Sequence, residues 1–438
     1  MVSGDIRLDT PVLNRRLRRY FQKHLTGIFD FGRAPNSIFD ELNYRSVFLT
    51  ATLYNTMIML NGASMTLNRS AYTKGRKEIY TRGRRPTKNG SYKTSDGYLA
   101  RKYYASSKTL LWHIKNNYDV VESALQYKGH NRKVNLLNHK LRDLVRRAVK
   151  RGIVPENPLT GITVAFDYFD QDFWGLHNQN VVTTFAEGTK LAFRYGTARV
   201  VSPKAEYCLP PVMMGAHSTA AEALKMGMAQ SDDVGLQVRT YLLDRYFFTI
   251  DAINLLHMRG LRYLMPATTA SLKTEMRKRI RNASREHVTI IRSYVIGSDP
   301  KHIARTDLVV VPPCWQSESK RNKNRLKKSP RTVVFATNLQ PKVGAAQEEV
   351  DVFGKELSRI YRLRFGIEAD WSILKSFRPR TTSKNPVVRL FYFYVSILLY
   401  DAWVYARNID TRWGWLIRFQ FLVLYVPGLN DLIPLDTG

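Results

Sequence analysis

The hydrophobic pattern of the chain changes character near residue 160. Before this point, apolar residues recur at the three- to four-residue spacing of amphipathic helices, as in 15–25 and 139–152. After it, short alternating runs dominate, beginning with GITVAFDYF at 161–169, whose two alternating faces are both mostly apolar. A strand of this kind lies inside a sheet that is covered on both sides. The pattern therefore predicts a mainly helical region over 1–155, followed by a central sheet.

The elements that follow the first strand have a recognisable order. The sequence predicts a hairpin turning near Gly196, a helix at 217–230, a strand at 239–244, a helix at 251–260 and a strand ended by Pro266. In this order, paired strands come first and helices then alternate with strands. An RNase H-like domain has its elements in the same order. We therefore expect an α/β (α+β) protein with an RNase H-like mixed sheet flanked by helices.

Four segments follow from these patterns. We expect a helical, basic DNA-binding region at 1–155, the first part of the core at 156–267, a basic, β-rich insertion at 268–350, and the second part of the core with C-terminal helices at 351–438.

The charge balance narrows the choice of partner. The chain has 68 Lys and Arg against 36 Asp and Glu, a formal net charge of +32. Solubility does not require such an excess, so a polyanion is expected, nucleic acid first and an anionic membrane second. Cys208 and Cys314 are too few for a metal-ligand cluster or a disulfide framework, which fits a reducing cytoplasm.

The strongly apolar stretch at 385–407 could be a transmembrane span or a buried helix. Arg389 and Asp401 interrupt it, and the run between them is well short of the ~20 residues that cross a bilayer. We expect a buried helix here and no membrane partner.

The segment YRLRFGIEADWSILK at 361–375 places four polar residues of different chemistry on one helical stripe. Tyr361, Arg364, Glu368 and Lys375 stand at offsets 0, 3, 7 and 14. At about 100° per residue they fall within roughly 60° of one another. An adjacent sector is apolar and would anchor the helix; it consists of Leu363, Ile367, Trp371 and Leu374. The plain alternative is an amphipathic helix with an i,i+4 salt bridge.

The spacing Y-x2-R-x3-E-x6-K resembles the signature of the DDE transposases of the insertion-sequence-four family, and the resemblance covers about 161–407. It extends to the apolar segment around Asp167 and to the Asp-Arg-x-Phe pattern that begins at Asp244. It implies an RNase H-like catalytic core in which Asp167, Asp244 and Glu368 are catalytic and hold two Mg²⁺ (or Mn²⁺) ions. Carboxylate oxygens are the ligands that such hard cations prefer.

The two aspartates have structural alternatives. A single Asp at the end of a strand is commonly a turn residue or a helix cap. Asp170 and Asp172 also stand close to Asp167, which lies near the expected end of its strand; the strand register favours Asp167.

The resemblance also implies the DNA contacts and the biology. Tyr361 and Arg364 would contact phosphates near the cleavage point, Lys375 a further phosphate, and Arg245 would also bind DNA. The partner would be double-stranded DNA, as terminal inverted repeats and target DNA, bound by a homodimer on paired ends. A hairpin intermediate on the donor ends and a cytoplasmic, nucleoid-associated location in a prokaryote are further implications.

The expected function is that of a transposase of an insertion sequence. It would cleave the ends of its element and join them to target DNA by two-metal phosphodiester hydrolysis and transesterification. Two alternatives stay open: a catalytically silent, transposase-derived DNA-binding protein, and an RNase H-like DNA nuclease without strand transfer.

Overall fold

The chain forms two compact units, Met1–Leu144 with Ser372–Gly438, and Val145–Trp371. The computed structural model describes residues 28, 44, 47–48, 107–117, 132–154, 159–178, 180–184, 190–201, 206–268, 272–283, 286–312, 332–378 and 381–409.

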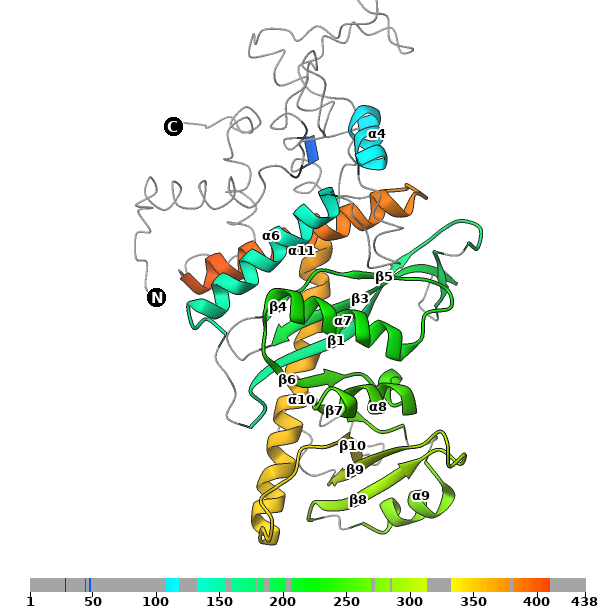
Figure 1. The fold of residues 1–438 in the computed structure, drawn as a ribbon, viewed down its shortest axis with the longest axis vertical. Helices are drawn as coiled ribbons and strands as arrows, with labels where there is room; N and C mark the ends of the chain where they lie inside the picture. The colour runs from blue at the N-terminus through cyan, green and yellow to red at the C-terminus, as the bar shows by residue number, and fades with distance from the viewer. Residues whose placement is uncertain are drawn as a thin grey trace, which may run out of the picture. The chain divides into compact units, whose positions relative to one another are not determined.

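A ten-stranded mixed sheet forms the centre of the second unit (Figure 1). Its main path is β2-β3-β1-β6-β7-β10-β9-β8, with β4 and β5 paired to β3. Strands β1, β6 and β7 are parallel, whereas all other pairings are antiparallel. The strands are β1 (Ile162–Asp172), β2 (Val182–Thr183), β3 (Leu191–Val201), β4 (Glu206–Cys208), β5 (Val212–Met214), β6 (Val238–Leu243), β7 (Arg262–Pro266), β8 (Thr289–Ile296), β9 (Ala304–Val311) and β10 (Val333–Thr337).

Helices cover both faces of this sheet, which confirms the expected mixed α/β class with flanking helices. The helices of this unit are α7 (Ala220–Val234), η1 (Arg245–Phe247), α8 (Ile250–Met258), α9 (Thr274–Arg281) and most of α10 (Gln347–Ser376). A capping box between Thr219 and Glu222 begins α7, and Gly235, at φ 75°, ends it. The sequence therefore marks both ends of this helix.

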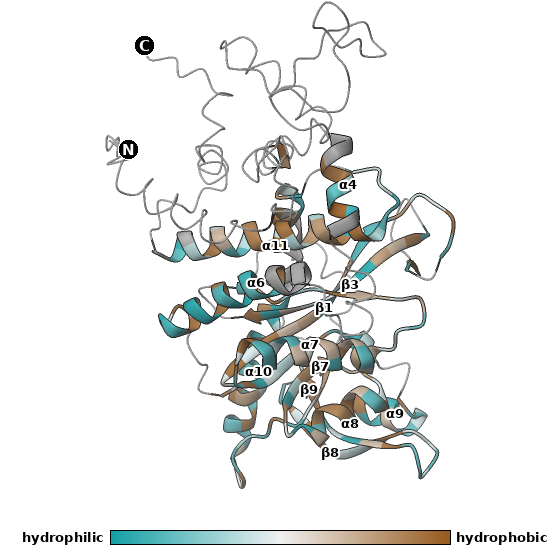
Figure 2. Cartoon of the chain, turned by 45° about the horizontal axis from the view of Figure 1, so that its top comes forward, coloured by the Kyte–Doolittle hydropathy of each residue, from teal (hydrophilic) through white to brown (hydrophobic). Residues whose placement is uncertain are grey.

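Helix α10 packs on one face through an apolar cluster. Leu357, Ile360 and Tyr361 of the helix lie against sheet residues that include Ala165 and Leu242. All five are nearly or fully buried. The central strands that meet the helix are drawn largely in hydrophobic colours in Figure 2, as expected for strands covered on both sides.

The opposite face of the sheet packs on α7, and two glycines permit the close approach. A Cβ on Gly227 of α7 would lie 2.3 Å from the ring of Phe166, and one on Gly196 of β3 would lie 2.8 Å from the same ring. The expected hairpin turn near Gly196 is wrong, because β3 runs straight through this residue opposite Tyr168. The glycine there makes room for an aromatic ring instead of reversing the chain.

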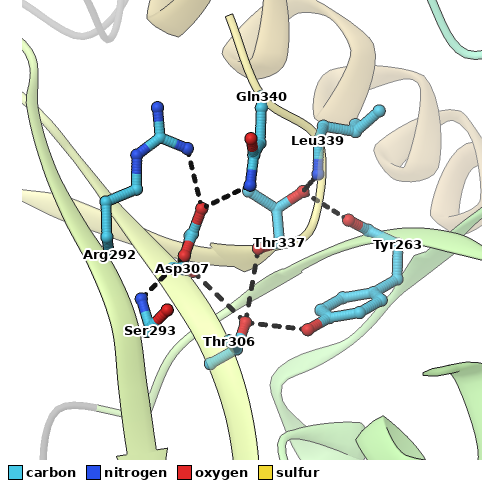
Figure 3. A network of polar contacts seen from close by, with 8 residues as sticks. All are labelled: Tyr263, Arg292, Ser293, Thr306, Asp307, Thr337, Leu339 and Gln340. Atoms are coloured by element: carbon cyan, nitrogen blue, oxygen red, sulfur yellow. Dashed lines mark hydrogen bonds and ion pairs between the residues drawn. The ribbon is translucent and has the colours of Figure 1, made fainter. Parts of the chain in front are cut away.

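The segment expected as an insertion is continuous with the sheet. Its strands β8, β9 and β10 extend the sheet from β7, with β10 pairing directly to β7. A polar network in which Asp307 is buried and its three donors are exposed stabilises this extension (Figure 3). Asp307 accepts hydrogen bonds from Arg292 Nη1 at 2.9 Å, the Ser293 backbone N–H at 2.8 Å and Gln340 Nε2 at 3.2 Å. Ser293 has φ 50° and lies where the β8–β9 register shifts, so the network fixes a β-bulge.

The other unit contains α4 (Ser107–Asn117), most of α6 (Arg132–Lys150) and α11 (Pro386–Ile409). The expected basic helix at 139–152 is confirmed within α6, and Gly152 follows it at φ 65°. Tyr394 of α11 donates a hydrogen bond to Asn138 Oδ1 of α6 at 2.9 Å.

One helix among the described residues is long and apolar enough to cross a membrane. It is Pro386–Tyr405 of α11, with a mean hydropathy of 1.5, and every residue of the window is buried inside the protein. Such burial is typical of the core helix that the sequence predicts here.

Several expected features lie outside the described residues. They are the helix at 15–25, Cys314, and the part of the expected C-terminal helices that follows residue 409.

Candidate active site

The register of β1 and β6 brings two of the expected catalytic aspartates together. These parallel strands pair directly, up to Phe166 opposite Leu243, so Asp167 and Asp244 are the next residues on each. Side chains alternate along a strand. Because Ala165 and Leu242 belong to the α10 cluster, Asp167 and Asp244 face α10 as well. The two aspartates therefore lie side by side, Asp167 within β1 and Asp244 directly after the adjacent strand β6.

The sequence predicts that Asp167 lies near the end of its strand, but in the structure it lies in the middle of β1. Strand β1 continues to Asp172, because β3 pairs with it beyond the point where β6 ends, with Asp167 opposite Thr197. Asp167 is therefore held in a regular ladder: its carbonyl accepts from Thr197 Oγ1 at 3.1 Å, and its Oδ1 accepts from the Tyr168 backbone N–H at 2.8 Å.

Asp244 occupies the cap position of η1 without acting as a cap. Among the described residues, its side chain accepts no capping hydrogen bond. Its side chain is 36% exposed. The structural alternative for a strand-end aspartate, a helix cap, is thus not realised here. Arg245, the next residue, is exposed.

The neighbouring aspartates belong to other environments. Asp170 pairs with Arg194 through two hydrogen bonds of 2.7 Å and accepts a third from Thr184 Oγ1 at 3.2 Å. It stands three positions from Asp167 in a regular strand and so faces the other side of the sheet. Asp172 is exposed at the end of β1. The structure brings neither of them to α10.

Arg364 of α10 reaches both aspartates that face the helix. Its Nη1 donates to Asp167 Oδ2 at 2.8 Å, and its Nη2 lies 3.8 Å from Asp244 Oδ1. Its Nε donates to the hydroxyl of Tyr361 at 3.0 Å. The arginine side chain is only 6% exposed. One guanidinium therefore joins two strands and the helix.

Burial and charge act in opposite directions on these groups. Burial lowers the pKa of Arg364, but the Tyr361 hydroxyl and the carboxylates of Asp167 and Asp244 outweigh it and raise that pKa above its usual value. Burial raises the pKa of Tyr361 to about 12, although the nearby guanidinium opposes this. At neutral pH the site therefore contains a cationic arginine and a protonated phenol.

The other two members of the signature lie further along α10. Glu368 is one helical turn beyond Arg364, and its side chain is not among those described. Lys375 is exposed and lies in the part of the helix that belongs to the other unit. The described side chains thus place Tyr361 and Arg364 beside the aspartates, and leave Glu368 and Lys375 untested.

Of the apolar face that the sequence predicts for α10, Leu374 is buried and Leu363 packs against the core, and the side chains of Ile367 and Trp371 are not described. The buried face is formed by Leu357, Ile360, Tyr361 and Arg364, whereas Leu363 is only partly buried. The Tyr361 ring packs in the core, 5.2 Å from the ring of Phe335, with its hydroxyl toward Arg364. The sequence contains a signal for this buried face, because Leu357, Ile360 and Arg364 are spaced three and four residues apart, as residues on one face of a helix are.

The donor chemistry of the site fits a hard divalent cation. Asp167 and Asp244 supply carboxylate oxygens from two rigid strands, and both side chains are partly exposed, at 17% and 36%. Among the described residues, no group of three His, Cys, Asp or Glu is placed to hold a metal. Glu368 is the expected third ligand.

Comparisons with known proteins give a likeness among solved structures and none among family models or curated sequences. No protein-family model matches the sequence, and no curated protein matches it. Among solved structures, the chain is similar to the piggyBac transposase in a cryo-EM structure of its synaptic complex with hairpin DNA. The two share 12% identity at a TM-score of 0.49, over 92% of this chain and 81% of that chain. Similarity at this level gives no residue-by-residue correspondence, so the functional argument rests on the site itself.

Proposed function

We propose that the protein is a DNA transposase that cleaves the ends of an insertion element and joins them to target DNA. The observation that carries the proposal is that two aspartates from neighbouring strands and the arginine of the signature helix meet at one place. Asp167 and Asp244, from two directly paired parallel strands, face the helix with the Tyr-Arg-Glu-Lys signature, and Arg364 of that signature contacts both. A chance match of the signature gives no reason for its arginine to meet these two aspartates.

The arrangement of the unit supports an RNase H-like core. Antiparallel β3 and β1 are followed in the sheet by parallel β6 and β7. Helices α7 and α8 precede β6 and β7 in the chain, and α10 comes last. This is the order of elements that the sequence pattern led us to expect of such a domain.

The proposed chemistry divides between the carboxylates and the bound ions. Asp167, Asp244 and Glu368 would hold two Mg²⁺ or Mn²⁺ ions, which when bound activate a water and stabilise the leaving oxygen. Hydrolysis of one strand at each element end leaves a 3′ hydroxyl, and this hydroxyl attacks a phosphodiester of the target DNA. The sheet keeps the two aspartates in fixed register, which is what a site of this kind requires of its scaffold.

Duplex DNA is the proposed partner, and helix α9 offers it an exposed basic surface. The exposed cations of this surface are Lys273, Arg277, Lys278, Arg279 and Arg281. Only Glu275 is acidic within the helix. Phosphate contacts from such residues bind DNA without reading its sequence. Two copies on paired element ends complete the proposal, because both ends must be cut together.

The test is to incubate the protein with Mg²⁺ and labelled DNA that carries the inverted repeats flanking its gene. The proposal predicts cleavage at the repeat ends followed by joining to a second DNA. Cleavage without joining would instead indicate a nuclease. Binding without cleavage would indicate a silent, transposase-derived protein, and either result would contradict the proposal.

A further inference from the structure

Arg364 is a cation held where cations from solution are expected to bind. A guanidinium that is only 6% exposed is costly unless charge and hydrogen bonds compensate for the lost water. Its compensation comes from Asp167 at 2.8 Å, Asp244 at 3.8 Å and the Tyr361 hydroxyl at 3.0 Å. Its Cζ also lies 5.4 Å from the centre of the Tyr361 ring, within cation–π range.

The ion pair neutralises part of the charge that would attract a metal. Asp167 and Asp244 together carry two negative charges, and Arg364 leaves one. A divalent cation bound to the same carboxylates would also be repelled by the guanidinium, and this repulsion is strong where solvent screening is weak. Metal and Arg364 therefore compete for the same oxygens.

We propose that Arg364 is the internal counter-ion of Asp167 and Asp244, which holds the two carboxylates together until a divalent cation displaces its guanidinium toward a DNA phosphate. The inference rests on the proposed function and adds its regulation. In the free protein the arginine orients the carboxylates and keeps metal affinity low. When DNA is bound, a phosphate offers the guanidinium a bidentate partner, and the carboxylates are released for the metal.

This exchange couples the two ligands. DNA binding raises metal affinity, and by thermodynamic reciprocity metal raises DNA affinity by the same factor. The consequence for a cleaving enzyme is that the metal site fills at a lower metal concentration when DNA is bound.

If the ion pair had only a structural role, removing Arg364 would change the metal affinity in the opposite direction. If Arg364 served only to fasten α10 to the sheet, its removal would loosen the two aspartates and weaken metal binding. The direction of the change in metal affinity therefore separates the two roles.

The test measures Mn²⁺ binding to the full-length protein without DNA, by the electron paramagnetic resonance signal of the free ion. Arg364→Gln is expected to bind Mn²⁺ at least about tenfold more tightly than the unaltered protein. Tyr361→Phe removes only the hydroxyl that accepts from Arg364 Nε, and should tighten binding by a smaller factor. Unchanged or weaker binding by Arg364→Gln would overturn the proposal.

A second variant covers the case in which Arg364→Gln does not fold. Arg364→Lys keeps a positive charge, but a single ammonium cannot bridge two carboxylates as the planar fork does. Its Mn²⁺ affinity should lie above that of the unaltered protein, and an equal or lower affinity counts against the proposal.

Asp167→Asn and Asp244→Asn separate a failure of this inference from a failure of the proposed function. Both should lose Mn²⁺ binding. If they keep it, the metal site is elsewhere, and the proposed function falls together with the role of Arg364. If they lose it while Arg364→Gln binds no more tightly, only the counter-ion role is wrong.

Discussion

Two charged contacts of helix α10, among the side chains that the structure describes, differ in the number of carboxylates that they bring together. At the start of the helix, Asp351 accepts from His287 Nδ1 and the Val288 backbone N–H, both at 2.8 Å, and from Gln347 Nε2 at 3.0 Å. Both carboxylate oxygens are engaged by neighbours of neutral or switchable charge. This contact has the features of a fastening between the helix and the residues just before β8.

The second contact, further along the helix, has two carboxylates around one donor group, where the first has several donors around one carboxylate. Two carboxylates, Asp167 and Asp244, converge on a single cation, Arg364, and the longer of the two distances is 3.8 Å. Both carboxylates are partly exposed although the arginine is not. The comparison shows that this part of the helix is distinguished by two carboxylates brought to one cation, whereas the start of the helix has a single carboxylate surrounded by donors.

Removing an aspartate at each contact should give the largest contrast. Asp244→Ala and Asp167→Ala should lower Mg²⁺-dependent DNA cleavage by more than about a hundredfold, because each removes a metal ligand. In the absence of metal, DNA affinity should be retained or slightly increased, because a carboxylate without its cation repels phosphate. Glu368→Ala should behave in the same way. A gel assay of cleavage with a parallel binding titration measures both quantities.

The matched controls are Asp351→Ala and Asp172→Ala. Asp351→Ala removes a carboxylate from the same helix, and Asp172→Ala one from the same strand as Asp167. Both should keep cleavage within a few-fold of the unaltered protein. Full activity in Asp244→Ala, or its loss in Asp172→Ala, would show that the carboxylates have been assigned wrongly.

The packing that supports both contacts is tested by Leu357→Ala. This side chain is fully buried between α10 and the sheet, so its truncation should lower the free energy of unfolding by about 2–5 kcal/mol. Leu363→Ala, at a partly buried position, should cost clearly less. Urea denaturation measures both changes. Equal costs at the two positions would mean that α10 is rotated about its axis.

The exposed cations of α9, unlike the buried Arg364, should affect the affinity for DNA of any sequence. The triple change Arg277→Ala, Lys278→Ala and Arg279→Ala on α9 should weaken binding to all duplex sequences alike. The log–log salt slope should fall in magnitude by about 0.9 for each phosphate that the variant no longer neutralises. Fluorescence anisotropy at several salt concentrations measures the slope. An unchanged slope would remove α9 from the DNA surface.

The smallest expected effect is a pH dependence at the Asp351 contact. The hydrogen bond to Asp351 raises the pKa of His287 above its usual 6.5. Burial opposes ionisation of Asp351, but the bond to His287, with the other donors, lowers the pKa of Asp351 below its usual 3.8. The stability from His287 is therefore fully present below about pH 6.5 and is lost as the pH rises through the raised value.

His287→Gln tests this titration. The difference in melting temperature between the unaltered protein and the variant should be largest near pH 5 to 6 and should shrink above the raised pKa. A difference that is the same at pH 5 and pH 9 would mean that the histidine is not charged in the contact.

The sequence predicted these features unevenly, for physical reasons. Alternation and apolar runs placed β1 and β6, because a strand buried on both faces must be apolar on both. The same pattern failed at Gly196, where a glycine serves the packing of a neighbouring ring, a contact that only the folded protein contains. It also ended β1 too early, because pairing with β3 extends that strand.

The site shows the same limit. Helical spacing placed Tyr361 and Arg364 on one stripe, but the partner of Arg364 lies 197 residues away in the chain. No local pattern encodes such a contact. The family resemblance implies that this arginine contacts a DNA phosphate, and the structure adds Asp167 and Asp244 as its partners in the free protein.

The central claim, a metal site formed by Asp167 and Asp244 against α10, is tested most directly by replacing Mg²⁺ with Fe²⁺. Ascorbate and peroxide then generate hydroxyl radicals that cut the protein backbone next to the bound ion. The account predicts cuts beside Asp167 in β1, beside Asp244 before η1, and in α10 near Glu368, with none at Asp351. Cuts at Asp351 and His287, or a backbone that stays intact around both aspartates, would contradict it.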